Sequence, residues 1–348
     1  MATVMPLHAD NMDSEATADG LLQERIARLE EKYKLMPNIS GYVQTEYTYR
    51  SSDNYNTFQL SRAHLDIKGS PTKWLDYRFH TALHGTPKII DVFVNFKPLK
   101  QLNIQIGQFK IPLTLENQYS PTVLEFTDNH QSLTYLCNLG NDLAGYSNTG
   151  RDIGLMLSGS AIEIGRKNAR HDLLRYYAGV FNGAELTKKD DNNYKDFSAR
   201  IEVYPLWQLA LSASCYVGSL SDVVDTAGTV VKKAPARNRL SAGLRWSDER
   251  LTCRAEWLRG LTDDLHSQGA YVMATYWITP KWQLCAGFDY YDADSSASDM
   301  WSNFYNIGVN FKPLRYLRIQ LDYSYRTFGT HRHTANHHVA DVLCTIQF

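Results

Sequence analysis

Apolar and polar residues alternate with a period of two along most of the chain that follows Pro37. Between Leu317 and Tyr325, every odd position is leucine, isoleucine or tyrosine, and every even position is arginine, glutamine, aspartate or serine. Segments 197–203 and 239–246 alternate in the same way. Successive side chains of a β-strand point to opposite faces, so each segment predicts a strand with one apolar and one polar face.

About sixteen such segments can be counted, an even number that fits an antiparallel barrel with a water-filled interior. They begin near Asn38, Tyr55, Trp74, Ile89, Leu102, Arg151, Leu173, Lys195, Trp207, Asn238, Leu251, Gly269, Trp282, Asn303, Leu317 and His337. The predicted fold class is all-β: a transmembrane antiparallel β-barrel of about 16 strands over residues 37–348, after a short N-terminal helical segment. The alternative is a soluble array of β-sandwiches, which would bury the apolar rows in a core.

The connections between these segments are short at one end of the predicted barrel and long at the other. Two related sequences, NFKPLKQLNIQI at 95–106 and NFKPLRYLRIQL at 310–321, each place a proline where its fixed φ suits a tight turn. Longer polar connections fall at 182–194, 219–236, 262–268, 292–301 and 328–336. This asymmetry is typical of barrels in the outer membrane of a Gram-negative-type cell, which is the predicted location.

The composition favours strands over helices as the spanning elements. Hydrophobic residues make up 43% of the chain, but no apolar run approaches the roughly 18 residues of a spanning helix. The 22 Tyr, 13 Phe and 7 Trp residues suit aromatic girdles at two membrane interfaces. A net charge of -1 gives no overall attraction to nucleic acid, so no such partner is expected. Because a basic side chain in lipid costs roughly 2 to 4 kcal/mol near the midplane, the polar rows should face an aqueous lumen.

The two ends of the chain have patterns of their own. Residues 1–20 have the character of a signal remnant or a disordered lead-in. At 21–36, apolar residues recur at intervals of four and three, which predicts a short helix: either a small coiled coil or one amphipathic helix resting on the barrel. The last strand ends in Phe348, which resembles the sorting signal of outer-membrane barrels. The five cysteines lack metal-like spacing, and three are expected to face lipid, at positions 215, 253 and 344.

One connection is much longer than the others. About forty residues separate the strand that ends near Lys110 from the strand that begins near Arg151. A connection of this length in a compact domain is expected to have a function. The flanking sequences, GQFKIPLTLE at 107–116 and GRDIGLML at 150–157, are similar to the phosphate-selective porin O/P family, in which comparable segments bracket a long third extracellular loop. The resemblance implies that residues 111–150 fold inward and narrow the channel. The alternative is a loop that stays on the surface.

The same resemblance implies a function. It predicts an outer-membrane porin whose water-filled channel passes small solutes by passive diffusion, with a preference for anions such as phosphate. A homotrimer is expected, because porins of this class are commonly trimers and the helical segment gives a second reason for association. Membrane lipid and lipopolysaccharide are the other expected partners, and no cofactor or metal ion is expected.

Basic residues on the lumen phase are the candidates for anion preference. The predicted pore-lining set is Arg62, Arg78, Arg200, Arg239, Arg245, Arg254 and Arg318. Five of these have an acid nearby on the same face that can cancel the charge: Asp66 for Arg62, Asp76 for Arg78, Glu202 for Arg200, Glu256 for Arg254 and Asp322 for Arg318. Arg239 has none and Arg245 has only Glu249 in the turn beyond, so these two are the first candidates. The charged residues predicted at the constriction are Lys110, Glu116, Glu125, Asp128 and Arg151.

Two rival functions remain open at this point. A plugged barrel could serve as an adhesin or a structural protein. A barrel hydrolase could use the loop histidines as a base or as metal ligands, at positions 331, 333, 337 and 338. The sequence contains no HExxH or GxSxG motif, so the prediction is that the chain is not an enzyme and has no catalytic residues.

Overall fold

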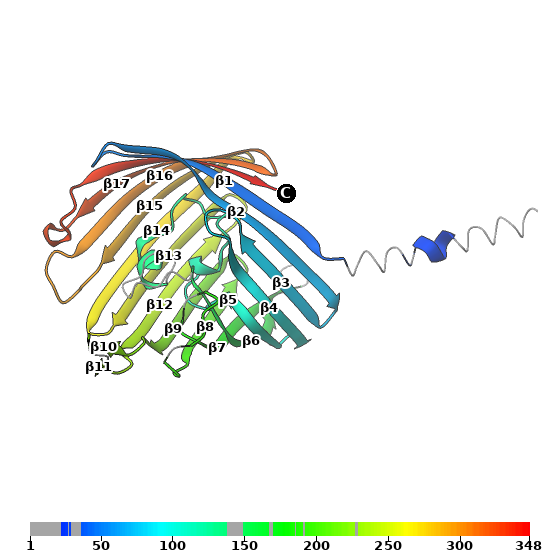
Figure 1. Cartoon of the computed structure of the whole chain (residues 1–348). Coiled ribbons are helices and arrows are strands. Elements are labelled where there is room, and N and C mark those ends of the chain that lie inside the picture. The colour runs from blue at the N-terminus through cyan, green and yellow to red at the C-terminus, as the bar shows by residue number, and fades with distance from the viewer. Residues whose placement is uncertain are drawn as a thin grey trace, which may run out of the picture.

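Sixteen antiparallel strands close into a barrel in the part of the chain that the structure describes (Figure 1). The structure is a computed structural model, and it describes residues 22–26, 28, 36–137, 149–166, 170–184, 186–190, 192–226 and 229–348. The predicted fold class and strand number are confirmed.

The barrel strands follow one another around the wall in chain order. Their bounds are β1 Asn38–Arg50, β2 Tyr55–Thr72, β3 Leu75–Ala82, β4 Lys88–Leu99, β5 Leu102–Lys110, β6 Arg151–Ile164, β7 His171–Phe181, β8 Asp196–Leu206, β9 Leu209–Ser219, β12 Ala236–Ser247, β13 Leu251–Thr262, β14 Leu265–Thr279, β15 Trp282–Asp292, β16 Trp301–Leu314, β17 Leu317–Phe328 and β18 His337–Gln347. Two short strands, β10 (Val223–Val224) and β11 (Val230–Lys232), form a separate small sheet in the connection between β9 and β12.

One predicted loop is much shorter than expected. The sequence predicts a connection at 262–268, but β13 and β14 continue pairing as far as Thr262 and Leu265. Asp263 adopts a φ of 59°, in the left-handed region that tight hairpin turns require. The hairpin therefore closes through Asp263 and Asp264 alone, and β14 begins four residues before the predicted start at Gly269.

The first and last strands close the barrel. β1 pairs with β18 over nine residue pairs, from Tyr42 opposite Gln347 to Arg50 opposite Val339. Beyond this ladder, the Gly41 amide donates to the Phe348 carbonyl over 2.9 Å, and the Phe348 amide donates to the Gly41 carbonyl over 3.0 Å. The terminal residue is thus hydrogen-bonded into the seam of the wall, which leaves the sheet without a free edge there.

The two faces of the wall differ as the alternation predicts. On β12, Leu240 and Leu244 are 51% and 40% exposed on the outer surface, whereas Arg239 and Ser241 are only 5% and 3% exposed because they point inward. Inward polar side chains bond to one another across strands, as Gln44 on β1 donates to the Thr345 hydroxyl on β18 over 3.0 Å. The apolar face therefore meets the membrane, and the polar face lines the interior.

The two ends of the barrel also differ. At one end, turns as short as two residues join the strands, for example at 100–101 and 315–316, and Pro98 and Pro313 stand two residues before these turns. The strand register shifts between Phe96 and Leu99 and again between Phe311 and Leu314, so each proline falls where the ladder is interrupted.

Near the N-terminus, residues 22–26 and 28 are helical. The predicted lead-in at 1–20 and most of the predicted helix at 21–36 lie outside the described residues. None of the described helices has the length and the apolar character that crossing a membrane would require.

Candidate functional site

The long connection after β5 enters the barrel and binds to its inner wall. Its described part, residues 111–137 and 149–150, contains the 3-10 turn η1 (Glu116–Gln118) and the helix α2 (Gln131–Leu136). Leu133 and Leu136 are almost fully buried, because α2 packs on the inner faces of β13, β14 and β15. Residues 111–137 are called the inner loop below.

Small residues on the wall make room for the inner loop. A Cβ atom on Gly260 of β13 would lie 2.7 Å from Leu136 Cδ2, and one on Gly269 of β14 would lie 2.6 Å from Ser132 Cβ. Both distances are too short for a Cβ contact, so a side chain at either position would require Leu136 or Ser132 to shift.

A buried ion cluster holds the start of the inner loop. Glu116 is 2% exposed, and its Oε2 accepts from His130 Nδ1 over 2.6 Å and from Arg254 Nη2 on β13 over 3.0 Å. The same guanidinium donates to Glu125 over 2.9 Å. Glu256, two residues along β13, accepts the amides of Leu115 and Glu116 over 2.6 and 3.0 Å. One wall strand thus binds both the carboxylates and the backbone of the loop.

Glu116 and His130 shift the pKa of each other. Burial would raise the pKa of Glu116, but the charges of His130 and Arg254 and the hydrogen bonds from His130 outweigh it and lower the pKa to about 2. Burial disfavours the protonated imidazole of His130, but the Glu116 carboxylate outweighs this and raises the pKa of His130. Each partner therefore favours the charged form of the other.

Other wall arginines bind carbonyl groups of the inner loop. Arg200 on β8, Arg239 on β12 and Arg318 on β17 donate to the carbonyls of Thr114, Leu136 and Leu124, over 2.8, 2.9 and 2.6 Å respectively. Arg200, Arg239, Arg254 and Arg318 are at most 5% exposed. These four arginines, predicted to line the pore, face inward and bind the loop.

The acid partners predicted for these arginines are mostly different in the structure. Arg200 does contact Glu202, over 3.3 Å. Arg254 and Arg318 turn to the loop instead, because Glu256 is occupied by loop amides and Asp322 accepts the amide of Thr127 over 2.7 Å. These contacts between wall and loop could not be predicted from local sequence patterns, because they join residues more than a hundred positions apart.

The inner loop leaves an open cavity on the opposite side, against β1 to β6. This wall–loop cavity has a volume of about 490 Å³, and its lining includes Tyr42, Arg62, His64, Lys88, Lys110 and Tyr119. Tyr119 belongs to the loop and the others to the wall, so the cavity lies between the two. Its position makes it the candidate path for solutes through the barrel.

The cavity has an excess of basic side chains. Arg62, Lys88 and Lys110 line it, and none of them contacts a carboxylate of the described residues. Arg62 donates to the Gln44 amide oxygen over 3.0 Å and not to Asp66, while Lys110 donates to the Tyr119 carbonyl over 2.6 Å. Lys88 is exposed. The predicted residue Lys110 lies here, and Lys88 is a further basic residue that the sequence reasoning missed.

The remaining predicted residues are distributed around this cavity and the loop. Arg151 lines the cavity and binds Asp91 over 2.6 Å. Arg78 binds Asp66 over 2.9 Å and Asp91 over 3.1 Å, and not Asp76. Arg245 is half-buried, and Asp128 is an exposed loop residue that contacts Arg326 over 3.1 Å.

Three histidines of the wall were not predicted, although their positions gave a signal. His64 follows Arg62 by two residues and His80 follows Arg78 by two, so each shares the inward phase of an arginine that was predicted. Both line the cavity together with His84. His80 Nδ1 lies 2.9 Å from Asp91 Oδ2, and its Nε2 lies 2.8 Å from His64 Nδ1.

The C-terminal histidines do not gather into one site. His338 faces outward and pairs with the Tyr323 hydroxyl over 2.6 Å, whereas His331 Nδ1 lies 2.6 Å from the Ser298 carbonyl. Across the described ranges, no group of three or more His, Cys, Asp or Glu residues has the arrangement of a metal site.

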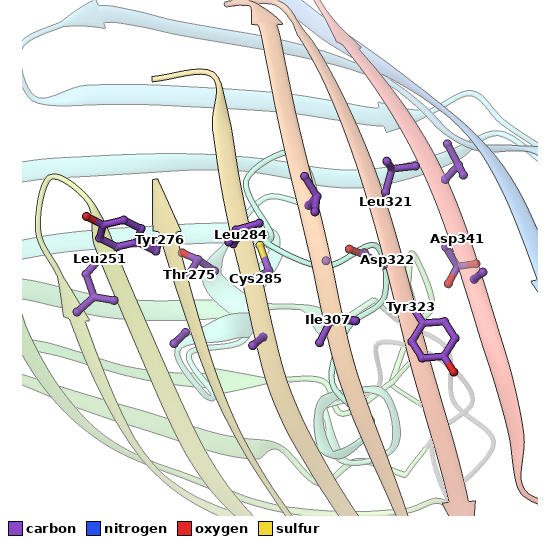
Figure 2. Close-up of a pocket in the computed structure, with 16 residues that line it drawn as sticks. Leu251, Thr275, Tyr276, Leu284, Cys285, Ile307, Leu321, Asp322, Tyr323 and Asp341 are labelled. Carbon is purple, nitrogen blue, oxygen red and sulfur yellow. The ribbon is translucent and has the colours of Figure 1, made fainter. Parts of the chain in front are cut away.

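A further large hollow lies on the outer surface and not in the channel. It has a volume of about 680 Å³ and crosses β13 to β18 (Figure 2). Leu284, Ile307 and Leu321 line it from the outer face and are 46%, 60% and 49% exposed. This apolar surface belongs to the membrane-facing band. The three cysteines expected to face lipid are each partly exposed and unpaired: Cys215, Cys253 and Cys344.

Solved structures with the same fold include an outer-membrane protein and porins. A loop-deletion mutant of OmpT from Vibrio cholerae aligns with a TM-score of 0.64 and 16% identity, over 90% of this chain and 99% of that chain. An anion-selective porin from Comamonas acidovorans aligns with a TM-score of 0.66 and 9% identity, over 90% and 99%. OmpF of Salmonella typhi aligns with a TM-score of 0.65 and 10% identity, over 90% and 97%. At these identities the likeness concerns the fold alone.

A sequence-family comparison covers almost the whole barrel. No curated protein matches the sequence. The family model described as phosphate-selective porin O and P matches residues 37–347, which confirms the resemblance first seen around the long connection. Because this match spans the closed sixteen-stranded barrel from its first strand to its last, the chain belongs to the phosphate-selective porin O and P family and is an outer-membrane porin, a channel for the passive diffusion of small solutes.

Proposed function

We propose that this porin prefers anions, and that the preference arises in the wall–loop cavity. The observation that supports the proposal is the set of three basic side chains, Arg62, Lys88 and Lys110, that line one cavity without an ion pair to any described carboxylate. A narrow passage with walls of low dielectric concentrates the field of a few fixed charges. Such a passage raises the local concentration of anions and lowers that of cations.

The loop carboxylates do little to offset this charge. Glu116 lines the cavity, but its carboxylate contacts Arg254 and His130, and Glu125 also contacts Arg254. Asp128 is paired with Arg326. We therefore place the source of selectivity on the wall that carries Arg62, and not at Arg239, whose guanidinium donates to the Leu136 carbonyl of the loop.

Reversal potentials test this proposal. The purified full-length protein would be inserted into a planar lipid bilayer that separates two KCl solutions of different concentration. If the channel prefers anions, the reversal potential will have the sign expected when chloride is more permeable than potassium. A potential of zero, or one with the sign of potassium permeation, would contradict the proposal.

We also propose that residues 111–150 constrict the channel without plugging it. Deletion of residues 117–145 should raise the single-channel conductance severalfold, because most of the obstruction would be gone. A plugged barrel, the alternative suggested by the sequence, would conduct only after the deletion. The two cases are distinguished by the conductance of the unmodified protein.

A homotrimer in contact with membrane lipid and lipopolysaccharide is the proposed assembly. One solved structure with the same fold, OmpT of Vibrio cholerae, is described as a trimer form, and it aligns with a TM-score of 0.62 and 13% identity over 90% of this chain and 99% of that chain. Chemical cross-linking of the protein in native outer membranes should give a ladder that ends at three subunits. A ladder that stops at one or two would contradict the proposal.

Catalysis gains no support as a competing function. The family to which the chain belongs is one of porins, and the histidines that suggested a hydrolase, such as His331 and His338, bond separately to Ser298 and Tyr323.

A further inference from the structure

Three stacked rings form a column along the wall of the wall–loop cavity. Tyr42 and His64 have ring centroids 4.7 Å apart and planes 18° apart, and His64 and His84 have centroids 5.6 Å apart and planes 20° apart. All three side chains line the cavity. The Tyr42 end of the column is buried, at 9% exposure, whereas His84 is only half-buried. A solute can therefore reach the column more readily at His84.

The surroundings of His84 leave room for one more ring. His84 lies in the connection between β3 and β4, and among the described residues its ring stacks on no ring except that of His64. The next residue, Gly85, also lines the cavity, and a Cβ atom built on it would meet no heavy atom within 4 Å outside its own chain neighbours. The flat ring of a solute can therefore stack on His84 and extend the column, in the offset geometry that aromatic pairs favour.

Two basic side chains lie close to the same ring. Burial lowers the pKa of His84, and the positive charges of Arg62 and Lys88 act in the same direction because both groups are near the imidazole. Arg62 donates to the neutral amide of Gln44, and Lys88 is exposed. The open end of the column is thus flanked by two cations that can pair with an anionic group of a solute.

Apolar side chains complete the lining of the cavity, at Ala82, Ile90, Pro121 and Leu124. A hydrated chloride ion gains nothing from apolar side chains or from stacked rings, because it keeps its contacts with water. A molecule with a flat apolar body and one carboxylate matches the column, the cations and the apolar lining together. The volume of about 490 Å³ is in the range of cavities that hold small organic molecules.

We propose that the wall–loop cavity binds aromatic carboxylates, with the ring of the solute stacked on His84 and its carboxylate paired with Arg62 or Lys88. The inference rests on the proposed anion preference and adds a class of organic solute to it. Benzoate is the simplest such solute and serves as the probe. While it is bound, it occupies the passage and reduces the chloride current.

A comparison of two solutes tests the stacking without any mutation. The readout is the concentration at which each solute halves the chloride current through the unmodified protein in a bilayer at about pH 7.5. Cyclohexanecarboxylate has the charge and ring size of benzoate, but its ring is puckered and more apolar. Benzoate should act at a concentration about twofold to tenfold lower, the factor that one aromatic pair gives. A cavity that acted through apolar contact alone would hold cyclohexanecarboxylate at least as tightly, and this result would overturn the proposal.

A third solute tests the pairing of the carboxylate. Benzamide keeps the flat ring of benzoate but carries a neutral amide in place of the charged group. It should halve the chloride current only at a concentration several times higher than benzoate, because the attraction to Arg62 and Lys88 is lost. Equal inhibition by benzamide and benzoate would contradict the pairing with these two side chains.

Matched variants then assign the stacking to His84. His84→Leu replaces the flat ring by a branched apolar side chain, so the preference for benzoate over cyclohexanecarboxylate should fall to about one. His84→Phe keeps a flat ring, so the preference should persist. His331→Leu, in a loop outside the cavity, is the control and should behave as the unmodified protein. An unchanged preference in His84→Leu, or its loss in His84→Phe, would overturn the proposal.

The outcomes also separate this inference from the proposed function. If the unmodified protein shows no chloride preference in asymmetric KCl, the anion-selective function itself fails. If it prefers chloride but does not distinguish benzoate from cyclohexanecarboxylate, only the inference about His84 fails.

Discussion

Arginine has two different roles on the inner wall, and its surroundings decide which one it takes. Arg254 and Arg318 are covered by the inner loop, and every contact they make is with a loop group or a neighbour on the wall. Arg62 is only partly covered and binds one neutral amide, of Gln44. The phase of each residue could be predicted from the alternation, but the covering loop could not. The sequence therefore placed these side chains on the correct face without showing which of them meet the solute.

Loss of the basic charges at Arg62 and Lys88 should weaken anion preference. In Arg62→Gln and Lys88→Gln, we expect the anion-to-cation permeability ratio to fall by about twofold to fivefold for each change, since a unit charge a few ångströms away in a partly aqueous passage is worth roughly 0.5 to 1 kcal/mol. Reversal potentials in asymmetric KCl measure this ratio. Lys281→Gln makes the same charge change in a turn outside the cavity and serves as control. An equal effect in all three variants would contradict a local origin of selectivity.

At the scale of the element, the inner loop depends on contacts with distant strands. The strands themselves could be predicted well, because alternation is a local property of each segment. The inward path of residues 111–137 was implied by family resemblance alone, since Arg254 meets Glu116 across 138 positions of sequence. The small sheet of β10 and β11 was missed because its strands are too short to show a period.

Removal of the Arg254 charge should release the inner loop. Arg254→Gln leaves the buried Glu116 and the half-buried Glu125 without their guanidinium partner, and breaking a buried ion pair such as Arg254–Glu116 costs about 3 to 5 kcal/mol. We expect a larger and noisier single-channel conductance. Arg326→Gln removes an ion pair with the exposed Asp128 and should change the conductance little, because exposed pairs contribute about 0 to 1 kcal/mol. Identical traces for the two variants would count against the buried cluster as the anchor.

The same anchor should depend on pH. Folding lowers the pKa of Glu116 from 4.5 to about 2. The contribution of Glu116 to the stability of the folded loop is therefore complete above pH 4.5 and is lost as the pH falls toward 2. The pKa of His130 is shifted in the opposite direction, upward. The contribution of His130 to stability is therefore complete below the ordinary histidine pKa and is lost as the pH rises through the raised pKa. We expect the conductance to be steadiest at neutral pH and to become noisier in acid. In Glu116→Gln the acid transition should disappear, and its persistence would assign it to another group.

At the scale of the whole molecule, closure depends on the seam between β1 and β18. A Cβ atom on Gly41 would lie 2.5 Å from the Phe348 ring and 2.6 Å from the His64 carbonyl oxygen, so the seam is tightly packed there. The number and order of the strands could be predicted from alternation and turn positions. The close approach at Gly41 could not, because it depends on the two ends of the barrel meeting.

A larger residue at position 41 should weaken the seam. We expect Gly41→Val to lower the stability of the barrel by about 1 to 3 kcal/mol, the usual cost of overpacking where a backbone atom cannot move aside. Urea-induced unfolding in detergent micelles measures this loss. Ala242→Val introduces the same side chain on the exposed outer face of β12 and is the control. Equal unfolding midpoints for the two variants would contradict the expectation.

The attachment of the inner loop to only part of the wall has a consequence for how such channels diversify. Strands β8 to β17 supply Arg200, Arg239, Arg254 and Arg318, whose replacement would endanger folding. Strands β2 and β4 carry Arg62, His64 and Lys88 around the wall–loop cavity, and the connection between β3 and β4 carries His84. Evolution can therefore change which solutes the channel passes by altering the strands that line the cavity, while the strands that bind the inner loop keep the fold unchanged.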